Sequence, residues 1–298
     1  MAQLKPGVVT GKDYLTLVAA AKAGGYALPA VNVSSSSTIN AVLEAAAKNQ
    51  ADVIIQLSNG GAQFYAGQGL KDGFQAKVLG AVAAALHVHL LAEHYGVCVV
   101  LHTDHANKGL IPWVDALLDH GEAYFKQHGK PLFSSHMLDL SEESMEFNLN
   151  ECARVLGRMA PLNMSLEIEL GVTGGEEDGI GKEMDESSAA DNSHLYTQPE
   201  DVLQAYDRLS PIGHFSVAAS FGNVHGVYKP GNVQLRPEIL KNSQALIEKQ
   251  HSTAAKPLNL VFHGGSGSEK DKIVAAVSYG VFKMNIDTDL QFAYSEAI

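Results

Sequence analysis

Short apolar runs alternate with longer segments of helical character along most of the chain. Eight runs stand out, at residues 27–33, 53–57, 97–105, 132–140, 163–171, 215–222, 258–265 and 281–287. They are largely apolar at successive positions, which is typical of parallel strands covered by helices on both sides. The pattern therefore predicts a series of strand–helix units.

Eight such units in one series predict a closed α/β fold, the TIM (β/α)8 barrel. An open, doubly wound sheet is the alternative. We favour the barrel because helices follow nearly every strand and because polar residues recur at the carboxyl ends of the strands, where barrel enzymes place their active sites. No internal repeat or linker interrupts residues 1–298, so one barrel domain is expected. After the last strand only TDLQFAYSEAI follows, which predicts a shortened final helix.

Composition narrows the class of partner. The formal net charge of −12, with no block rich in lysine or arginine, argues against nucleic acid and anionic membranes. The apolar window 78–101 contains His87, His89 and Glu93, so it predicts a helix and a strand rather than a membrane span. Two cysteines and no recognisable secretory signal indicate a reducing cytoplasm.

Ionisable side chains gather at the predicted strand ends. Glu167 and Glu169 alternate within one strand and so share a face, and a carboxylate inside a barrel needs a partner or a cation. Imidazole and carboxylate groups are the ligands of zinc and similar divalent ions. The candidate metal ligands are His105, His225 and His263, with Asp139 and Glu169 close by.

A single histidine at a strand end is more often a hydrogen-bonded core residue than a ligand, and only the convergence of several favours a metal site. Asp104 and His105 are neighbours, so in a regular strand they would face opposite sides. Both reach one site only if the strand ends there, which leaves Asp104 beside the metal and suited to proton transfer. His102 and His136 are expected to be supporting or packing groups, and the helical histidines to be structural.

Glycine-rich stretches follow the last three strands, in GNVHG, HGGSGS and the end of KMNIDT. Loops at these positions of barrels often present backbone N–H groups to a phosphate, although a tight turn is the simpler interpretation of any one of them. SNGG at 58–61 is a weaker signal of the same kind. The polar segment 172–197 is long enough to be a functional loop that closes over a substrate, and it contains Glu177.

Six motifs together, HTDH, SSHMLD, LEIELGVTGGEEDG, ASFGNVHGVYKPGNV, VFHGGSGS and KMNIDTD, closely resemble the class II, metal-dependent fructose-1,6-bisphosphate aldolases of the IIA type. The resemblance runs from about residue 5 to the end of the chain. It implies reversible aldol cleavage of fructose 1,6-bisphosphate to dihydroxyacetone phosphate and glyceraldehyde 3-phosphate, in glycolysis or gluconeogenesis. This is the lyase activity EC 4.1.2.13.

The resemblance also implies roles for individual residues. His105, His225 and His263 match the ligands of the catalytic Zn²⁺, and Asp139 and Glu169 match additional metal-binding positions. Asp104 matches the acid/base at the C4 hydroxyl, and Glu177 matches the acid that moves a proton at the ketose carbon. The substrate positions are Asn32, Ser58, Gly226, Gly264, Gly265, Ser266, Asn285, Ile286, Asp287 and Thr288. A monovalent cation, K⁺ or Na⁺, is expected beside the phosphate loops.

The sequence departs from the family pattern at two points. Ala106 stands where the family often has cysteine, and family members continue into a tail with a basic residue that reaches the second phosphate across a homodimer. The resemblance thus implies a homodimer and a chain that is a truncated form. Three alternatives stay open: an aldolase for tagatose 1,6-bisphosphate, a metal-dependent hydrolase on the same barrel, and an inactive truncated homologue.

Overall fold

A computed structural model describes residues 4–173, 175–177, 180–182, 195–225 and 235–297, and in it the predicted barrel is closed. All eight predicted strands are confirmed, seven of them shorter than the apolar run and the one at 53–57 with the predicted bounds. They are β2 (Leu28–Asn32), β3 (Val53–Leu57), β4 (Cys98–Thr103), β5 (Ser135–Leu138), β6 (Ser165–Leu170), β9 (Phe215–Ala219), β10 (Leu260–Phe262) and β11 (Val281–Ile286).

Every pairing around the barrel is parallel. The strands neighbour one another in chain order from β2 to β6 and on through β9, β10 and β11, and β11 pairs back with β2 from Lys283↔Leu28 to Ile286↔Val31. The open doubly wound sheet is therefore excluded, because such a sheet has two unpaired edges. All eight carboxyl ends meet at one end of the barrel.

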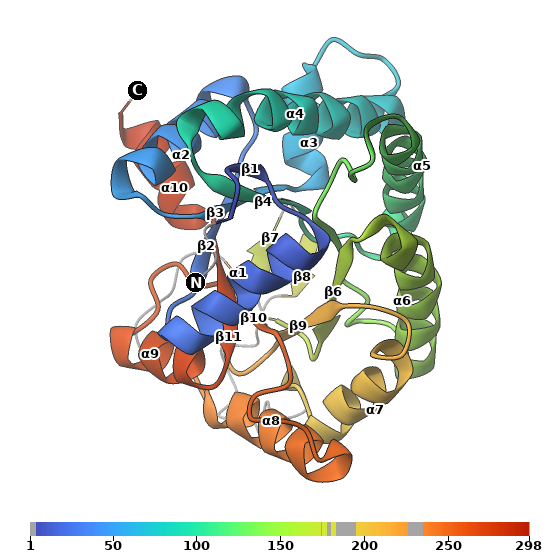
Figure 1. Cartoon of the computed structure of the whole chain (residues 1–298), viewed down its shortest axis with the longest axis vertical. Helices are drawn as coiled ribbons and strands as arrows, with labels where there is room; N and C mark the ends of the chain where they lie inside the picture. Colours follow the sequence, from blue (N-terminus) through green and yellow to red (C-terminus); the bar gives the residue numbers. More distant parts are fainter. Residues whose placement is uncertain (1–3, 174, 178–179, 183–194, 226–234, 298) are drawn as a thin grey trace.

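A ring of helices covers the strands from outside, and the first helix along the chain lies across one end of the barrel (Figure 1). The helices are α1 (Gly11–Gly24), α2 (Ser36–Asn49), α3 (Asn59–Ala66), α4 (Gly73–Tyr95), α5 (Ile111–His128), α6 (Met145–Met159), α7 (Pro199–Leu209), α8 (Glu238–His251), α9 (Lys270–Ser278) and α10 (Thr288–Glu296). The predicted short final helix is α10, which has 9 residues.

Local capping explains several of the helix boundaries. Ser35 and Thr38 form a capping box at the start of α2, and Asp72 accepts a hydrogen bond from Gln75 N–H at the start of α4. α1 and α4 end at Gly25 and Gly96, which adopt the left-handed conformation that favours glycine after a helix.

The SNGG stretch forms a helix rather than the glycine-rich loop expected after the second strand. Ser58 is the N-cap of α3 and its hydroxyl accepts from Gly61 N–H at 3.1 Å. α3 packs tightly on α4, where a Cβ on Gly80 would lie 1.7 Å from the carbonyl oxygen of Ala62. Within SNGG, a Cβ on Gly61 would lie 2.9 Å from Val33 C=O, so the glycine permits a close backbone approach in the first turn of α3 rather than a flexible loop.

In the described part of the chain, α4 is the one helix long and apolar enough to cross a membrane. It has 23 residues, and its buried positions pack with the helices and strands of the outer core. His87 bonds Tyr65 and Asn40, and His89 bonds the carbonyl of Leu132. These contacts confirm the structural interpretation of the helical histidines.

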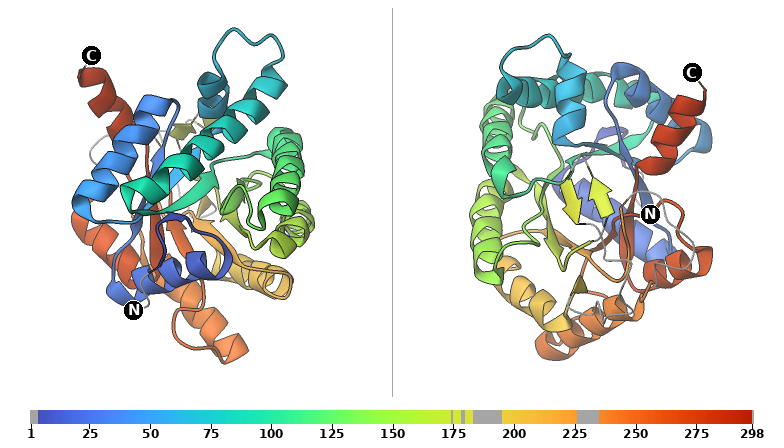
Figure 2. Two further views of the ribbon diagram at one scale, coloured as in Figure 1. Left: turned by 45° about the horizontal axis from the view of Figure 1, so that its top comes forward. Right: turned by 180° about the vertical axis from the view of Figure 1, so that it is seen from behind.

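A second apolar cluster fills the barrel at the amino ends of the strands. Tyr14, Leu17 and Val18 of α1 pack there against inward-facing strand residues such as Val100 and Phe282. Figure 2 shows α1 lying across this end of the barrel. The floor is therefore apolar and closed, which leaves polar groups to the opposite end.

A two-residue strand, β1 (Gly7–Val8), was not predicted. It pairs with the first half of β4, which β5 does not reach, because the β4–β5 ladder begins only at His102↔Ser135. The hydroxyl of Ser134 joins the three segments: it accepts from Leu101 N–H at 2.9 Å and donates to Val9 C=O at 2.7 Å.

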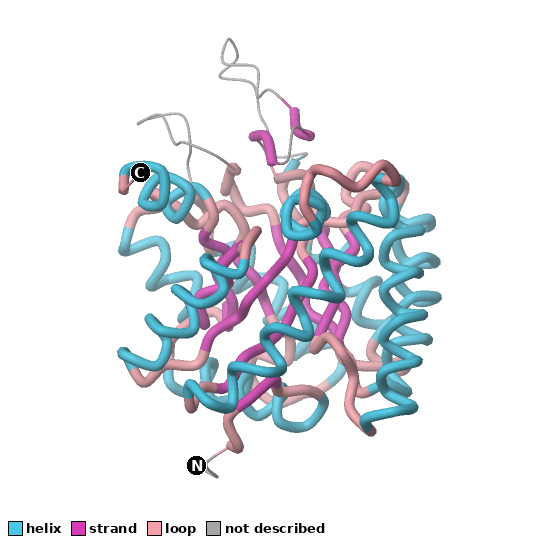
Figure 3. Tube along the Cα trace, turned by 90° about the horizontal axis from the view of Figure 1, so that it is seen from above, coloured by secondary structure: helices cyan, strands magenta, loops and turns pink. Residues whose placement is uncertain are grey.

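The long polar segment includes an antiparallel hairpin of β7 (Gly175–Glu177) and β8 (Ile180–Lys182). Figure 3 shows it standing beyond the carboxyl ends of the barrel strands. The segment thus lies at the end of the barrel where the polar strand-end residues gather.

Replacing Ser134 by alanine tests the seam between β1, β4 and β5. The change leaves a buried N–H and a buried C=O without the hydroxyl, so we expect Ser134→Ala to lower the free energy of unfolding by about 2 kcal/mol. Chemical denaturation measures this. Ser278→Ala, which removes an exposed hydroxyl bonded to Ala275 C=O, is the control. Equal stability of the two variants would contradict this account of the seam.

Candidate active site

The candidate site begins where β4 ends. His105 has φ of 25°, a left-handed backbone that is uncommon for a residue other than glycine. This turn follows directly after Thr103, the last residue of β4. Neither Asp104 nor His105 therefore lies in the regular strand, which is the break that the sequence required for both side chains to reach one site.

Three histidines from separate loops converge at this point. The ring centroid of His105 lies 5.0 Å from that of His225 and 4.6 Å from that of His263, and the latter two are 6.0 Å apart. One nitrogen of each ring lies within 4.8 Å of a nitrogen of the others, a spacing that can hold one metal ion. The convergence predicted for these three residues is confirmed as geometry.

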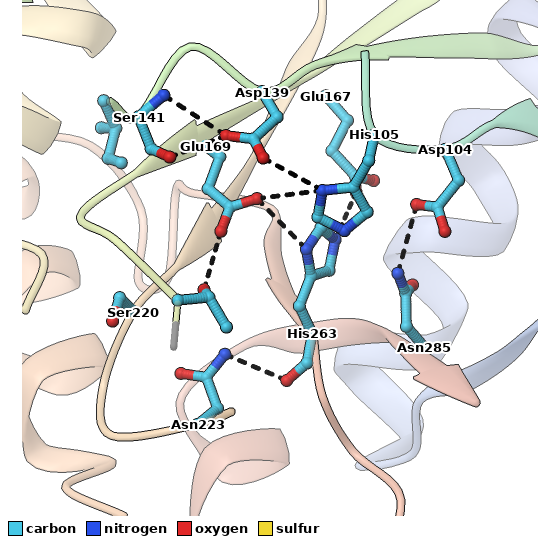
Figure 4. Close-up of polar contacts among 12 residues, drawn as sticks. Asp104, His105, Asp139, Ser141, Glu167, Glu169, Ser220, Asn223, His263 and Asn285 are labelled. Carbon is cyan, nitrogen blue, oxygen red and sulfur yellow. Dashed lines mark hydrogen bonds and ion pairs between the residues drawn. The ribbon is translucent and has the colours of Figure 1, made fainter. Parts of the chain in front are cut away.

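Two carboxylates adjoin the imidazoles (Figure 4). Nδ1 of His105 donates to Asp139 at 3.2 Å and lies 3.6 Å from Glu169. Burial raises the pKa of Asp139, but the hydrogen bonds from His105 and Ser141 lower it to about 2. His105, Asp139 and Glu169 form a second group whose ligand atoms are close enough to share an ion.

The donor set fits a divalent ion. Nδ1 of His263 and Oε2 of Glu169 are both buried, make no hydrogen bond with the described residues, and lie 3.4 Å apart. Polar atoms buried in this way cost free energy unless something satisfies them. Three imidazoles flanked by carboxylates match the ligands that zinc takes in proteins.

Asp104 is fully buried and is held by side-chain amides. Asn32 donates to its Oδ2 at 3.1 Å, Gln56 donates to the same oxygen at 2.7 Å, and Asn285 donates to Oδ1 at 3.3 Å. Asn32 and Asn285 were predicted as substrate residues, whereas Gln56 was missed. The one signal for it was a glutamine in the otherwise apolar run VIIQL.

An ion pair lies beneath the imidazoles. Lys283 donates to Oε1 and Oε2 of Glu167 at 2.7 and 2.9 Å, and His263 Nε2 donates to Oε1 at 2.9 Å. Burial raises the pKa of Glu167, but the Lys283 ammonium holds it well below its usual range. Glu167 was identified from the sequence as a carboxylate that needs a partner, but Lys283 was not identified as that partner, because the two positions are 116 residues apart.

His102 and His136 are supporting groups, as predicted. Nδ1 of His102 bonds Ser135 at 2.7 Å, and Nδ1 of His136 bonds Thr103 at 2.7 Å. Burial lowers the pKa of His136 to about 3 and, together with the charge of Lys283, that of His102 well below its usual value. Both rings are therefore neutral packing and hydrogen-bonding residues.

The loop after β10 and the start of α10 meet beside the histidines. Gly264 has φ of 61°, and a Cβ on it would lie 2.2 Å from Val224 C=O, so this position requires glycine. Ser266 accepts from Asp289 N–H at 3.4 Å. Gly264, Gly265, Ser266, Asp287 and Thr288 are thereby placed at one corner of the site.

The remaining predicted substrate residues lie in different surroundings. Ser58 caps α3 in the loop after β3. The side chain of Ile286 lines an apolar groove with Tyr26 and Val277, so its backbone rather than its side chain would take part in binding. Glu177 pairs with Ile180 in the hairpin, and Gly226 lies outside the described residues.

Comparison with known proteins identifies the family. The family model "Fructose-bisphosphate aldolase class-II" matches residues 12–298. "Fructose-bisphosphate aldolase" of Haemophilus influenzae is 58% identical over 293 residues, covering 97% of this chain and 80% of that protein. "Fructose-bisphosphate aldolase class 2" of Escherichia coli K12 is 57% identical over 298 residues, covering 99% and 82%.

A solved structure agrees with this. The crystal structure of fructose-bisphosphate aldolase from Campylobacter jejuni superimposes with a TM-score of 0.87 at 57% identity, covering 98% of this chain and 81% of that one. The barrel, the three converging histidines and these matches lead to one assignment. The chain belongs to the class II fructose-bisphosphate aldolases, a family of metal-dependent lyases.

Proposed function

We propose that this chain cleaves fructose 1,6-bisphosphate reversibly into dihydroxyacetone phosphate and glyceraldehyde 3-phosphate, with Zn²⁺ as its metal. One observation supports this most directly. His105, His225 and His263 bring one nitrogen each within 4.8 Å of the others, and the buried carboxylate of Asp104 belongs to the residue next to His105 in the chain. Relatives with this name match nearly the whole chain.

The three histidines would hold the zinc and leave a coordination position for substrate oxygen. When bound, the ion supplies Lewis-acid polarisation of the ketose carbonyl. Asp139 and Glu169 form a second group with His105. This group would hold either a second divalent ion or the first ion in an alternative position. We assign a monovalent cation, K⁺ or Na⁺, to the neighbouring glycine loops on the strength of the family resemblance.

Asp104 would take the proton of the C4 hydroxyl while the bond between C3 and C4 breaks. The electron pair of the broken bond stays on C3, which belongs to the half that becomes dihydroxyacetone phosphate. The C4 oxygen becomes the carbonyl oxygen of the aldehyde. Asn32, Gln56 and Asn285 hold the carboxylate by their N–H donors, which fixes its direction. Glu177, on the segment at the barrel mouth, would return a proton to the carbon of dihydroxyacetone phosphate.

Phosphate binding is assigned to the corner formed by the loop after β10 and the start of α10. Backbone N–H groups of a helix start and of a glycine loop favour an anion. Gly264, Gly265, Ser266, Asn285, Ile286, Asp287 and Thr288 would hold the ketose phosphate, together with Gly226. Asn32 and Ser58 would line the aldehyde side.

We further infer that the protein is a cytoplasmic homodimer built on a single domain, residues 1–298. Both cysteines, Cys98 and Cys152, are buried and unbridged. Leu79, Leu86 and Leu90 are exposed along α4, Leu90 by 72%, and such an apolar stripe favours a protein contact. Sedimentation equilibrium of the purified chain that shows only a monomer would contradict the dimer.

Removing the metal tests the proposal as a whole. We expect a strong chelator to abolish triose phosphate formation from fructose 1,6-bisphosphate, and added zinc to restore it. The His263→Ala variant lacks one of three ligands and should bind zinc about 100-fold more weakly. His120 is exposed, so the His120→Ala variant should bind zinc with unchanged affinity. Full turnover after chelation would exclude this function. Turnover of tagatose 1,6-bisphosphate in parallel distinguishes the two sugars.

Replacing Asp104 by asparagine tests the proton transfer. The substitution keeps the shape but removes the base, so kcat should fall by about 10²–10⁴-fold. Zinc content should stay at the level of the unmodified protein, because Asp104 is not among the three nitrogen ligands. Asp271→Asn, at an exposed position of α9, is the matched control. A kcat within a few fold of the unmodified value would remove Asp104 from the mechanism.

Zinc binding should depend on pH. Burial lowers the pKa of His263, but the hydrogen bond to Glu167 and the nearby Glu169 raise it to about 9 in the metal-free protein. Below that pH His263 holds an extra proton, which zinc must displace. We therefore expect zinc affinity to fall as pH decreases below about 9, with about one proton released per zinc at pH 7.5. Calorimetry in buffers of different ionisation enthalpy measures the protons, and a pH-independent affinity would contradict the assignment.

A further inference from the structure

The lysine inside the barrel has no role in the chemistry proposed above. Lys283 is on β11 and its side chain is 2% exposed. A buried ammonium group costs free energy unless it is paired, and replacing a whole buried ion pair by apolar residues is often neutral or stabilising. The contacts of Lys283 indicate why a lysine is present at this buried position.

Among the described residues, the hydrogen bonds of the Lys283 ammonium group go to one carboxylate. The ammonium of Lys283 lies 2.7 Å from Oε1 and 2.9 Å from Oε2 of Glu167, so both oxygens are held. Glu167 is 2% exposed and cannot turn toward water. The pair therefore fixes the direction of the carboxylate as well as neutralising its charge.

The fixed carboxylate in turn orients a proposed metal ligand. Oε1 of Glu167 accepts the Nε2 proton of His263 at 2.9 Å. Nδ1 of the same ring then faces the cluster of Glu169 and His105, at 3.4 Å from Glu169 Oε2. Metal-binding histidines generally donate their second nitrogen to a carboxylate, which selects the tautomer and holds the ring.

His102 is the other neighbour of the Glu167 carboxylate. Its Nε2 lies 3.7 Å from Oε2 of Glu167, and its Nδ1 bonds Ser135 at 2.7 Å. Without Lys283, Oε2 would have His102 as its nearest remaining partner. Glu167 could then turn away from His263.

We propose that Lys283 and Glu167 are positioning residues that orient His263 for metal binding, Lys283 by fixing both oxygens of Glu167 and Glu167 by accepting the Nε2 proton. This rests on the proposed metal site. Neither residue touches substrate. Lys283 is also not a nucleophile in this arrangement, because its nitrogen is buried and bonded to both oxygens of Glu167.

Lys283→Met tests the proposal through the metal rather than through turnover. We expect zinc affinity, measured against a chromophoric chelator, to fall by about 10–100-fold. The visible absorption spectrum of the Co²⁺-loaded protein should change in shape, because one ligand is no longer held. Lys22→Met is the control: it removes a half-buried lysine that bonds Leu258 C=O and Asn259 away from the site, and it should leave both readouts unchanged.

A second variant covers the case in which Lys283→Met does not fold with Glu167 unpaired. Glu167→Gln combined with Lys283→Met removes both charges, so no unpaired ion is buried, and we expect the same loss of affinity. Unchanged zinc affinity and an unchanged cobalt spectrum in either folded variant would overturn the proposal. Borohydride trapping of substrate on Lys283 would also overturn it. Failure of the unmodified protein to bind zinc or Co²⁺ would instead refute the metal site itself.

Discussion

Burial of charge inside the barrel is the constraint on which the site depends. Glu167 and Glu169 alternate on one strand, and both are almost fully buried. Glu167 is neutralised by Lys283, whereas Glu169 faces imidazoles of His105 and His263. One carboxylate is thus satisfied within the protein, and the other is left beside atoms that suit a cation. Glu167 and Lys283 thus form a supporting layer, and Glu169 with the imidazoles forms a binding layer.

The closed parallel barrel produces that layering. Inward-facing positions near the amino ends of the strands are apolar and pack against α1, whereas those farther along are polar. Because every strand runs the same way, residues distant in sequence reach the same depth. Lys283 and Glu167 meet at one level, and Asn285, two residues farther along β11, meets Asp104 at the next.

Much of this could be predicted from sequence, for reasons visible in particular residues. The eight apolar runs gave the strands, and polar residues at their ends gave His105, Asp139 and His263. Gln56 was missed because one polar residue in an apolar run is a weak signal, and the pairing of Lys283 with Glu167 depends on the closing of the barrel. β1 is only two residues long, too short for a periodic pattern. SNGG was misjudged because glycine occurs equally in a loop and where a helix start passes close to backbone, as Gly61 does beside Val33 C=O.

The apolar floor formed by α1 determines how molecules reach the histidines. Tyr14, Leu17 and Phe282 fill the barrel at that end, so the polar layer communicates with solvent through the loop end. Under the proposed function, both an ion held by the three histidines and the sugar would enter by this opening. A sugar phosphate bound at the loop end would therefore slow metal exchange.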